Sequence, residues 1–395
     1  MVRIAGTRGR AALLGTCLSV TLVGSLVVST AAADPTVEPE TAAPSGNEVS
    51  PSALAAPWSM TALEGAEAIA AGNGVFVAVG QTGDPPQAAT WWSTDGRAWE
   101  PARLTDATVG SGLTQVTATD DGFVALGMES ELYGATKERV EAWYSTDGQT
   151  WERATIEKPA KSGFQAIASG LADGPAGSLA LGTFIGQDLA GQRLWRSADA
   201  VTWQPAKLPK VSNPVWDAVV SYPKGYLLLG QSGRGVASNW RSADGLTWKR
   251  VKDTPRLFDV AVGEGGTLTG IGYKHIYRSP KGPRAWEKAL TRPNSWQVGG
   301  SNAFSFVEWD GSEFVVPGND FSGCGPSTDE CHTNPLLVSV DGSAWSEAAG
   351  PDGLPGADEA TWITDVASLD GATAVLGQHE GQTVVWVVDE ASTGV

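Results

Sequence analysis

The stretch Trp143-Tyr144-Ser145-Thr146-Asp147-Gly148-Gln149-Thr150-Trp151 decides the fold, because the chain repeats it. Close copies occupy residues 91–99 and 240–248, and a third copy at 195–203 has Ala200 in place of the glycine. Weaker copies occupy 277–286 and 337–345, and a seventh begins at Trp386 and keeps only Asp389. A motif that recurs at this period predicts a fold built from one repeated unit.

Two further elements precede each copy. A short apolar strand closed by glycine, such as Phe123-Val124-Ala125-Leu126-Gly127, recurs with its glycine at Gly80, Gly182, Gly230, Gly272, Gly318 and Gly377. An earlier apolar segment, such as residues 216–220, supplies another strand. Each unit therefore holds four short strands in roughly 37 to 60 residues. Seven such units predict an all-β, seven-bladed β-propeller over residues 58–395.

The repeat also predicts how the ring closes. The last copy breaks off after its third strand, whereas Trp58-Ser59-Met60-Thr61 at the start belongs to no blade of its own. That segment is similar to residues 99–102, which form a fourth strand. We therefore expect the N-terminal strand to complete the last blade.

The repeated motif resembles the Asp-box, or BNR, repeat of sialidases and many other propellers, although it is one residue shorter before its closing tryptophan. The resemblance implies that the motif forms the turn between the third and fourth strands of a blade. Its aspartates would then be structural: Asp95, Asp147, Asp199, Asp244 and Asp341. Aspartate accepts bonds from nearby backbone N–H groups, and glycine permits positive φ. Most of the 17 tryptophans occupy motif positions, which favours blade core over a carbohydrate-stacking platform.

Residues 1–33 have the pattern of a signal peptide: early arginines, an apolar run to about Thr30 and then Ala31-Ala32-Ala33. A retained membrane anchor and lipid attachment at Cys17 are the alternatives. Residues 34–57 are rich in Pro and Ala and have no apolar periodicity, which indicates a disordered linker. We expect a secreted or cell-wall-associated protein that starts at Asp34, is monomeric and is not inserted in a membrane.

Charge and cysteine content narrow the partners. The net charge is −17, and it becomes −20 without the three arginines of the signal. A surface of this sign disfavours nucleic acid. Cys324 and Cys331 lie in a turn-rich loop, and in an exported protein a disulfide between them is expected. A metal site with His332 is the alternative, but it lacks a fourth ligand. We therefore predict no metal and no cofactor.

Polar residues near the start of the innermost strands suggest a ring around the channel. We aligned seven of them at one position of the repeat: Glu67, Gln115, Gln165, Asp217, Asp259, Ser305 and Asp365. Such a ring could hold a cation or a sugar. The alternative is that each side chain caps its strand by bonding to a neighbouring blade, since a position filled in every repeat is usually a fold requirement.

Evidence for catalysis is weak. The resemblance to sialidases implies an arginine triad, a Tyr–Glu nucleophile pair and an Arg-Ile-Pro motif, but the only Arg-Ile is Arg3-Ile4 within the signal. Arg196, Arg241 and Arg278 occupy equivalent places, yet they directly precede the motif serine. That end of the blade faces away from the active-site mouth in Asp-box propellers. Whether the protein is an enzyme therefore stays open, and the balance favours a non-enzyme.

The loops between the second and third strands vary most, and variable loops carry function on repeat scaffolds. Residues that directly follow the strand-closing glycines should ring the channel mouth there, together with nearby cationic or titrating groups. The predicted ligand-binding set is Gln81, Gln231, Arg234, Tyr273, His275, Asn319, Gln378 and His379. Facing channel water is their alternative role. The resulting hypothesis is a non-catalytic propeller that binds a glycan or extracellular protein, and the alternative is an exo-acting glycoside hydrolase of the sialidase-like group.

Overall fold

The computed structural model describes residues 58–130, 139–157, 165–185, 190–293, 304–318, 335–348 and 362–389. Strands and turns make up nearly all of them, and a single turn of 3-10 helix, η3 (Glu264–Gly266), interrupts blade 5. Within these residues no helix is long and apolar enough to span a membrane. Asn319, Cys324, Cys331 and His332, together with the predicted signal and linker, lie outside the described residues.

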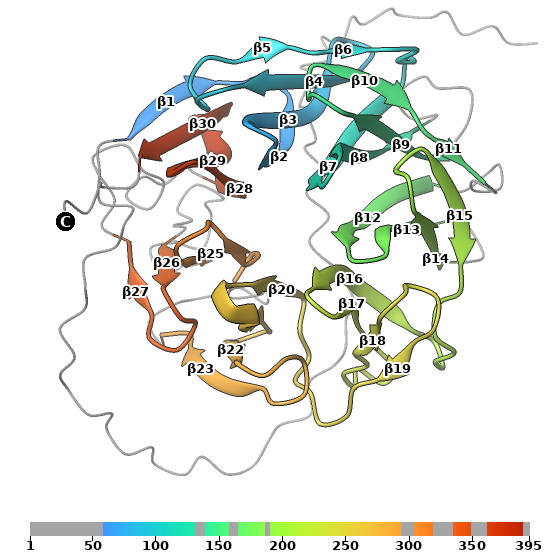
Figure 1. Cartoon of the computed structure of the whole chain (residues 1–395), viewed down its shortest axis with the longest axis vertical. Coiled ribbons are helices and arrows are strands. Elements are labelled where there is room, and N and C mark those ends of the chain that lie inside the picture. The colour runs from blue at the N-terminus through green and yellow to red at the C-terminus, as the bar shows by residue number, and fades with distance from the viewer. Residues whose placement is uncertain are drawn as a thin grey trace, which may run out of the picture. The chain divides into compact units, whose positions relative to one another are not determined.

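Seven sheets surround a central axis, which confirms the seven-bladed propeller (Figure 1). Blade 1 contains β2 (Ala66–Gly72), β3 (Val75–Thr82), β4 (Gln87–Ser93) and β5 (Glu100–Pro101). Blade 2 contains β7 (Ser111–Thr119), β8 (Gly122–Glu129), β9 (Arg139–Ser145) and β10 (Thr150–Arg153). Blade 3 contains β12 (Gln165–Gly174), β13 (Gly177–Ile185), β14 (Ala190–Ser197) and β15 (Thr202–Ala206). Blade 4 contains β16 (Val215–Tyr222), β17 (Gly225–Gln231), β18 (Trp240–Ser242) and β19 (Lys249–Arg250).

The remaining blades follow the same order from the axis outward. Blade 5 contains β20 (Asp259–Val262), β21 (Leu268–Ile271), β22 (His275–Ser279) and β23 (Glu287–Thr291). Blade 6 contains β24 (Glu308–Trp309), β25 (Phe314–Pro317), β26 (Leu336–Ser339) and β27 (Ser346–Glu347). Blade 7 contains β28 (Trp362–Leu369), β29 (Ala372–His379) and β30 (Gln382–Asp389), and β1 (Ser59–Ala62) is its fourth strand.

Strand β1 closes the ring as the sequence predicted. It pairs antiparallel with β30, with Ser59 opposite Val387 and Ala62 opposite Val384. The chain therefore fastens its first strand into its last blade, and no blade is left with an incomplete sheet.

Blades 2 and 3 differ from the predicted four strands, because each has a fifth. Strand β6 (Arg103–Leu104) leaves blade 1 and pairs in parallel with β10, and β11 (Thr155–Ile156) leaves blade 2 and pairs in parallel with β15. The extra strand is the connection between blades, running along the outer edge of the next blade before it turns inward. A connection of this kind carries no motif of its own, so the repeat pattern gave no sign of it.

The hydrophobic core lies between the blades. Seven clusters of buried residues are present, and each combines residues of two neighbouring blades. Between blades 7 and 1, for example, Val385 and Leu376 pack with Phe76 and Ile69. The second strands have buried side chains on both faces, as an unbroken apolar run such as β3 requires.

The repeated Ser-x-Asp turns lie between the third and fourth strands, as expected. In blade 2, Oδ1 of Asp147 accepts bonds from the N–H groups of Gln149 (2.8 Å) and Thr150 (2.9 Å). Gly148 has φ 74°, and its N–H donates to Oγ of Ser145 over 2.9 Å. The indole of the fully buried Trp151 donates to the Gly148 carbonyl over 3.0 Å. These aspartates therefore hold the turn.

Candidate functional site

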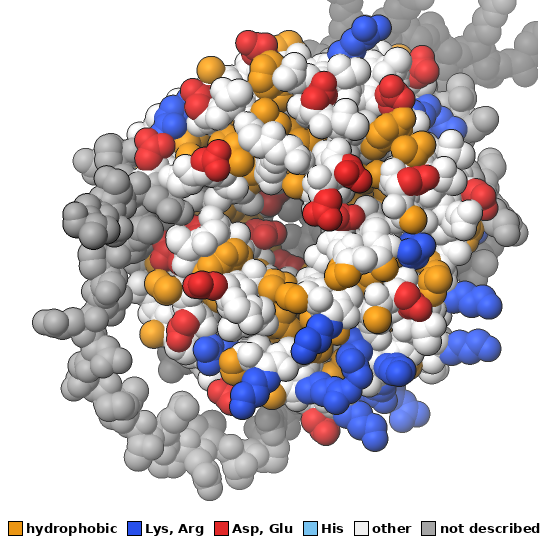
Figure 2. Space-filling view, viewed as in Figure 1, with side chains coloured by type: hydrophobic (Ala, Val, Ile, Leu, Met, Phe, Trp, Pro, Cys, Tyr) orange, Lys and Arg blue, Asp and Glu red, His pale blue; other side chains and the backbone are white. Residues whose placement is uncertain are grey.

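The innermost strands begin at the end of the channel opposite the Ser-x-Asp turns, which is also where the loops between second and third strands emerge. Figure 2 shows Asp and Glu side chains in and around the hollow at the centre of the ring. We take this channel mouth as the candidate site, because the described residues of the predicted polar ring and of the predicted ligand-binding set lie at this end of the blades.

The strand register corrects the alignment of the polar ring. In most blades the innermost strand has a one-residue bulge beside the strand-closing glycine: Asp217 is the bulged residue in blade 4, between Trp216 and Ala218. Glu67 is bulged in the same way, but Asp365 and Gln115 follow the bulge by one residue, and Gln165 precedes Ser169, the bulged residue of its blade, by four. The seven residues thus do not share one position.

Two of the ring aspartates join neighbouring blades. Asp365 in blade 7 accepts hydrogen bonds from the N–H of Ile69 in blade 1 (2.8 Å) and of Val366 (2.9 Å). Asp259 in blade 5 accepts bonds from the N–H of Val307 (3.1 Å) and of Val260 (2.8 Å). Each carboxylate uses one oxygen on its own strand and the other on the next blade. This is the strand-capping role that the sequence offered as the alternative to ligand binding.

A third carboxyl, Glu308 in β24, completes an acidic group on blades 5 to 7. Burial raises the pKa of Glu308 well above its usual value, and the negative charges of Asp259 and Asp365 raise it further. Burial likewise raises the pKa of Asp365 to about 7, even though its two N–H bonds act in the opposite direction. Burial in this wall of the channel therefore raises the pKa of all three carboxyls, Asp259, Glu308 and Asp365. Among the described residues, no group of three or more His, Cys, Asp or Glu side chains is placed to hold a metal ion.

Asp217 and Glu67 have side-chain partners instead. Oδ1 of Asp217 lies 4.0 Å from the Arg256 guanidinium, which stacks 4.6 Å from the centre of the Phe258 ring. Burial raises the pKa of Asp217 to about 6 and the charge of Arg256 opposes that rise. Glu67 accepts a bond from Nε2 of Gln81 over 3.1 Å. The structure thus brings together two residues that the sequence had placed in separate sets.

The other described residues of the predicted ligand-binding set lie in or beside the loops between second and third strands. The Tyr273 side chain is 42% exposed, which makes it one of the few large exposed hydrophobic groups among the described residues. Nδ1 of His275 lies 3.1 Å from Oγ1 of Thr291. Gln378 donates to Oγ1 of Thr383 over 3.0 Å, and the ring of the neighbouring His379 meets Trp386 edge-on at 6.2 Å. Gln231 is half-buried and Arg234 is exposed.

Sequence reasoning missed an ionic cluster in blade 2. Glu129 accepts bonds from Arg139 (2.6 Å), Arg153 (2.7 Å) and Thr108 (2.6 Å), and Arg153 also bonds Glu141. Against the effect of burial, hydrogen bonds with Glu141, Arg139, Thr108 and Arg153 lower the pKa of Glu129 to about 2. Burial raises the pKa of Glu141 to about 8.

Two neighbouring carboxyls whose pKa values are shifted in opposite directions are typical of a catalytic acid–base pair. The Glu141 side chain is only 1% exposed, however, so substrate has no access to it. The cluster joins three strands, and Glu141 and Arg153 follow Glu129 by 12 and 24 residues in the sequence. No sequence motif predicts it.

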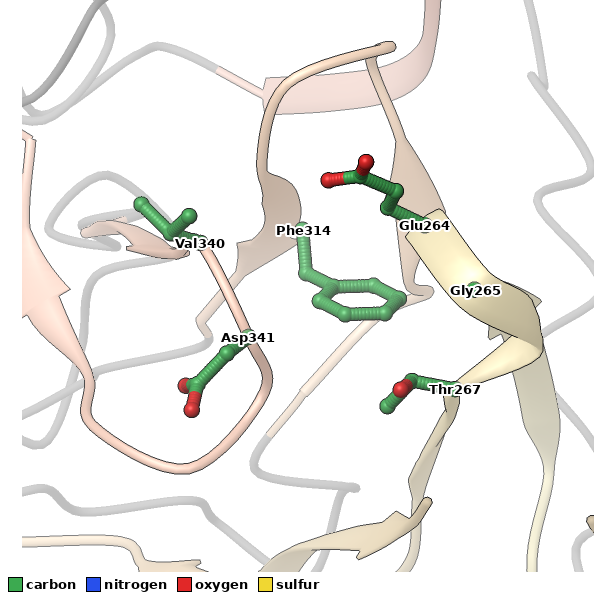
Figure 3. A pocket seen from close by; sticks show the side chains of 6 residues that line it. All are labelled: Glu264, Gly265, Thr267, Phe314, Val340 and Asp341. Atoms are coloured by element: carbon green, nitrogen blue, oxygen red, sulfur yellow. The ribbon is translucent and has the colours of Figure 1, made fainter. Parts of the chain in front are cut away.

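The opposite end of the molecule has a shallow hollow of about 320 Å³ between blades 5 and 6. The Phe314 ring lies between Thr267 on one side and Asp341 on the other, and Glu264 and Val340 stand at the rim (Figure 3). Oδ1 of Asp341 accepts the N–H of Ser343 over 2.8 Å, as the turn requires.

The three equivalent arginines lie at this same end. Arg278 donates to the Asp341 carbonyl over 2.7 Å, and Arg196 donates to the Ala176 carbonyl. Both guanidinium groups thus bond to backbone carbonyls of the turns, and neither contact supports an arginine triad.

Comparison with known proteins supports the fold. No family model matches the sequence, and no curated protein matches it either. The structure is similar to YCF48 bound to D1 peptide, with 18% identity, a TM-score of 0.50, and coverage of 86% of this chain and 100% of that one.

It is also similar to a Trypanosoma rangeli sialidase in complex with the inhibitor DANA (12% identity, TM-score 0.48, 84% of this chain and 60% of that one). A Fusarium graminearum α-L-arabinofuranosidase mutant in complex with an iminosugar inhibitor shares 15% identity over 71% of this chain and 92% of that one, with a TM-score of 0.39. The present chain thus spans about three fifths of the length of the sialidase. Both catalytic and non-catalytic propellers share this architecture, and fold alone does not choose between them.

Proposed function

We propose that this chain is a non-catalytic propeller of the Asp-box type that binds a glycan or an extracellular protein at its channel mouth. The observation that carries the proposal is that both oxygens of Asp259 and of Asp365 accept bonds from backbone N–H groups, one on the same strand and one in the next blade. A catalytic acid or nucleophile must reach substrate, and these carboxyls are instead committed to joining blades. The blade 2 glutamates are closed off by their arginines.

The mouth has groups that suit binding. Tyr273 is an exposed aromatic residue, and Gln378 and Gln81 have amides that both donate and accept hydrogen bonds. Uncharged groups of this kind match a polyhydroxylated or peptide ligand. The D1 peptide bound by YCF48 is consistent with a propeller of this kind acting as a peptide-binding module.

The test is a paired comparison. Wild-type protein is first screened on a glycan array and a peptide array, and with fluorogenic sialosides and arabinofuranosides. We expect binding without turnover. The double variant Tyr273→Ala with Gln378→Ala should then bind the identified ligand more weakly. The double variant Arg196→Ala with Arg241→Ala, at the opposite end, should bind it as the wild type does. The reverse result, or hydrolysis of a glycoside, would overturn the proposal in favour of a glycoside hydrolase.

We also propose that the protein is exported and begins at Asp34, on the strength of the signal-like residues 1–33. Intact mass of material exported by the native host checks this cleavage. A lipid-modified Cys17 would contradict it.

A further inference from the structure

Positive charge is concentrated in blades 4 and 5. Residues 207–292 contain 15 Lys and Arg and 6 Asp and Glu, a net charge of +9, whereas the rest of the chain contains 12 and 38, a net charge of −26. In Figure 2 the Lys and Arg side chains gather on the side of the ring that holds β18, β19, β22 and β23. A single-sign field of this size on a protein of the opposite sign steers a charged partner to one place.

Most of these side chains are available to a partner. Among the described residues, two of these side chains have an acidic partner within 4.0 Å: Arg256 pairs with Asp217 and Arg278 with Asp341, each at 4.0 Å. Lys281, Arg284 and Lys288 are exposed, and no carboxylate among the described residues lies within 4.0 Å of them. These three residues lie in and just before β23, the outermost strand of blade 5. The outer edge of blade 5 is therefore positively charged.

Blades 2 and 3 show how a further strand is added at the outer edge of a blade. In blade 2 the added strand β6 donates from the N–H of Arg103 to the Gln149 carbonyl (2.8 Å) and from Thr105 to Trp151 (2.9 Å). In blade 3, Thr155 and Glu157 donate in the same way to Val201 (2.8 Å) and Trp203 (2.9 Å).

In blade 5, β23 is the last strand of its sheet among the described residues. An unpaired edge is a template for a further strand. Lysine on an edge strand can discourage pairing with a neutral or basic segment. The same positive charge attracts an acidic segment.

We propose that an acidic, extended polypeptide segment binds beside β23 as a parallel fifth strand of blade 5. Main-chain bonds to the edge would supply affinity, as β6 and β11 do within this chain, and Lys281, Arg284 and Lys288 would select acidic side chains. This surface is separate from the channel mouth, so the inference goes beyond the proposed function and stands or falls without it.

The fold offers a matched variant for the main-chain bonds. Lys288 lies two residues after Trp286 and pairs with Tyr277, and at the same place blades 1 and 3 have Pro101 opposite Trp91 and Pro205 opposite Trp195. Proline is therefore compatible with this position, and Lys288→Pro should fold. It removes an N–H together with the charge, whereas Lys288→Ala removes the charge alone.

The experiment measures fluorescence anisotropy of a labelled 12-residue peptide of alternating Glu and Thr with the full mature chain in 50 mM NaCl. We expect Lys281→Glu with Arg284→Glu to raise Kd at least about tenfold. Lys210→Glu with Lys224→Glu, which makes the same change of charge at exposed positions away from β23, should raise it less than about threefold. Lys288→Pro should bind several-fold more weakly than Lys288→Ala, and melting temperatures check that each variant is folded.

A second probe keeps the test independent of the proline variant. The same peptide N-methylated at every residue retains its charge but has no N–H group to donate to the strand edge, and we expect it not to bind. Three outcomes would overturn strand pairing in favour of polyanion binding alone. The first is an equal loss of affinity in the two double variants, and the second is equal binding of the methylated and unmethylated peptides. The third is displacement of the peptide by polyphosphate together with an unchanged affinity of Lys288→Pro. Absence of binding in 50 mM NaCl would overturn it as well.

Discussion

Oδ2 of Asp365, in the last blade, accepts a hydrogen bond from the backbone N–H of Ile69, in the first blade, over 2.8 Å. The same carboxyl has its pKa raised to about 7 by burial. Asp259 repeats the arrangement between blades 5 and 6. Two joints of the ring are thus formed by buried carboxyls whose pKa values burial raises, that of Asp365 to about 7.

Stability should therefore fall as pH rises. The folded state holds the Asp365 proton more tightly than the unfolded state, so the free energy of unfolding decreases between the ordinary pKa of 3.8 and about 7. The contribution is on the order of 2–4 kcal/mol. Asp365→Asn, which cannot ionise, should flatten this decrease while costing roughly 1–3 kcal/mol at pH 4.5 for a lost bond. Urea unfolding at pH 4.5, 6 and 7.5 checks both, and identical slopes in the two proteins would contradict the assignment.

Closure by β1 should contribute strongly to stability. Deletion of residues 58–63 removes the fourth strand of blade 7 and exposes the edge of β30. We expect the melting temperature to drop by at least about 5 °C. Deletion of residues 34–55 should leave it nearly unchanged, and comparable losses from the two deletions would argue against closure.

The Ser-x-Asp turns should affect stability and not binding. Asp147→Ala loses two backbone N–H bonds and should destabilise the protein by about 1–3 kcal/mol. Asp121→Ala, an exposed acid on a turn at the same end of blade 2, should have little effect. Unfolding curves make the comparison. If Asp147→Ala abolished ligand binding at unchanged stability, the turns would have to be counted as functional.

The two blade 2 glutamates should respond differently to the same substitution. At pH 7 Glu141 holds a proton, because burial raises its pKa to about 8, whereas Glu129 is charged with a pKa of about 2. Glu141→Gln therefore replaces one neutral group by another. Glu129→Gln leaves Arg139 and Arg153 without their shared anion, and it should cost at least about 1–2 kcal/mol more. Denaturation at pH 7 decides this, and a larger loss from Glu141→Gln would reverse the assignment of charges.

The repeat made the architecture predictable, because each copy of the motif specifies a turn whose chemistry depends on residues close in sequence. Ser145, Asp147, Gly148 and Trp151 satisfy one another within seven residues. Ring closure was predictable for the same reason, since β1 has the sequence of a missing fourth strand.

The candidate site was less predictable, because its geometry depends on single-residue offsets. A bulge moves the following side chain to the other face of the strand, so Glu67 and Asp365 differ in orientation. Their spacings to the strand-closing glycine, 13 residues for Glu67 and 12 for Asp365, differ by only one. The link from Glu67 to Gln81 and the blade 2 cluster depend on strand pairing, which sequence spacing does not encode. The pairing of β6 and β11 was not predictable for a similar reason, because it depends on where the connection between two blades lies in space.

Those two added strands tie blades 1, 2 and 3 together along their outer edges, in addition to the cores between them. Opening blade 2 alone would break bonds to a segment that leaves blade 1, so the three blades should exchange their amide hydrogens as one cooperative unit. The N–H groups of Arg103, Thr105, Thr155 and Glu157 should be protected for as long as the strands of that unit. Blades 4 to 6, joined at their edges by no such segment among the described residues, should open first, and thermal unfolding should begin in that half of the ring.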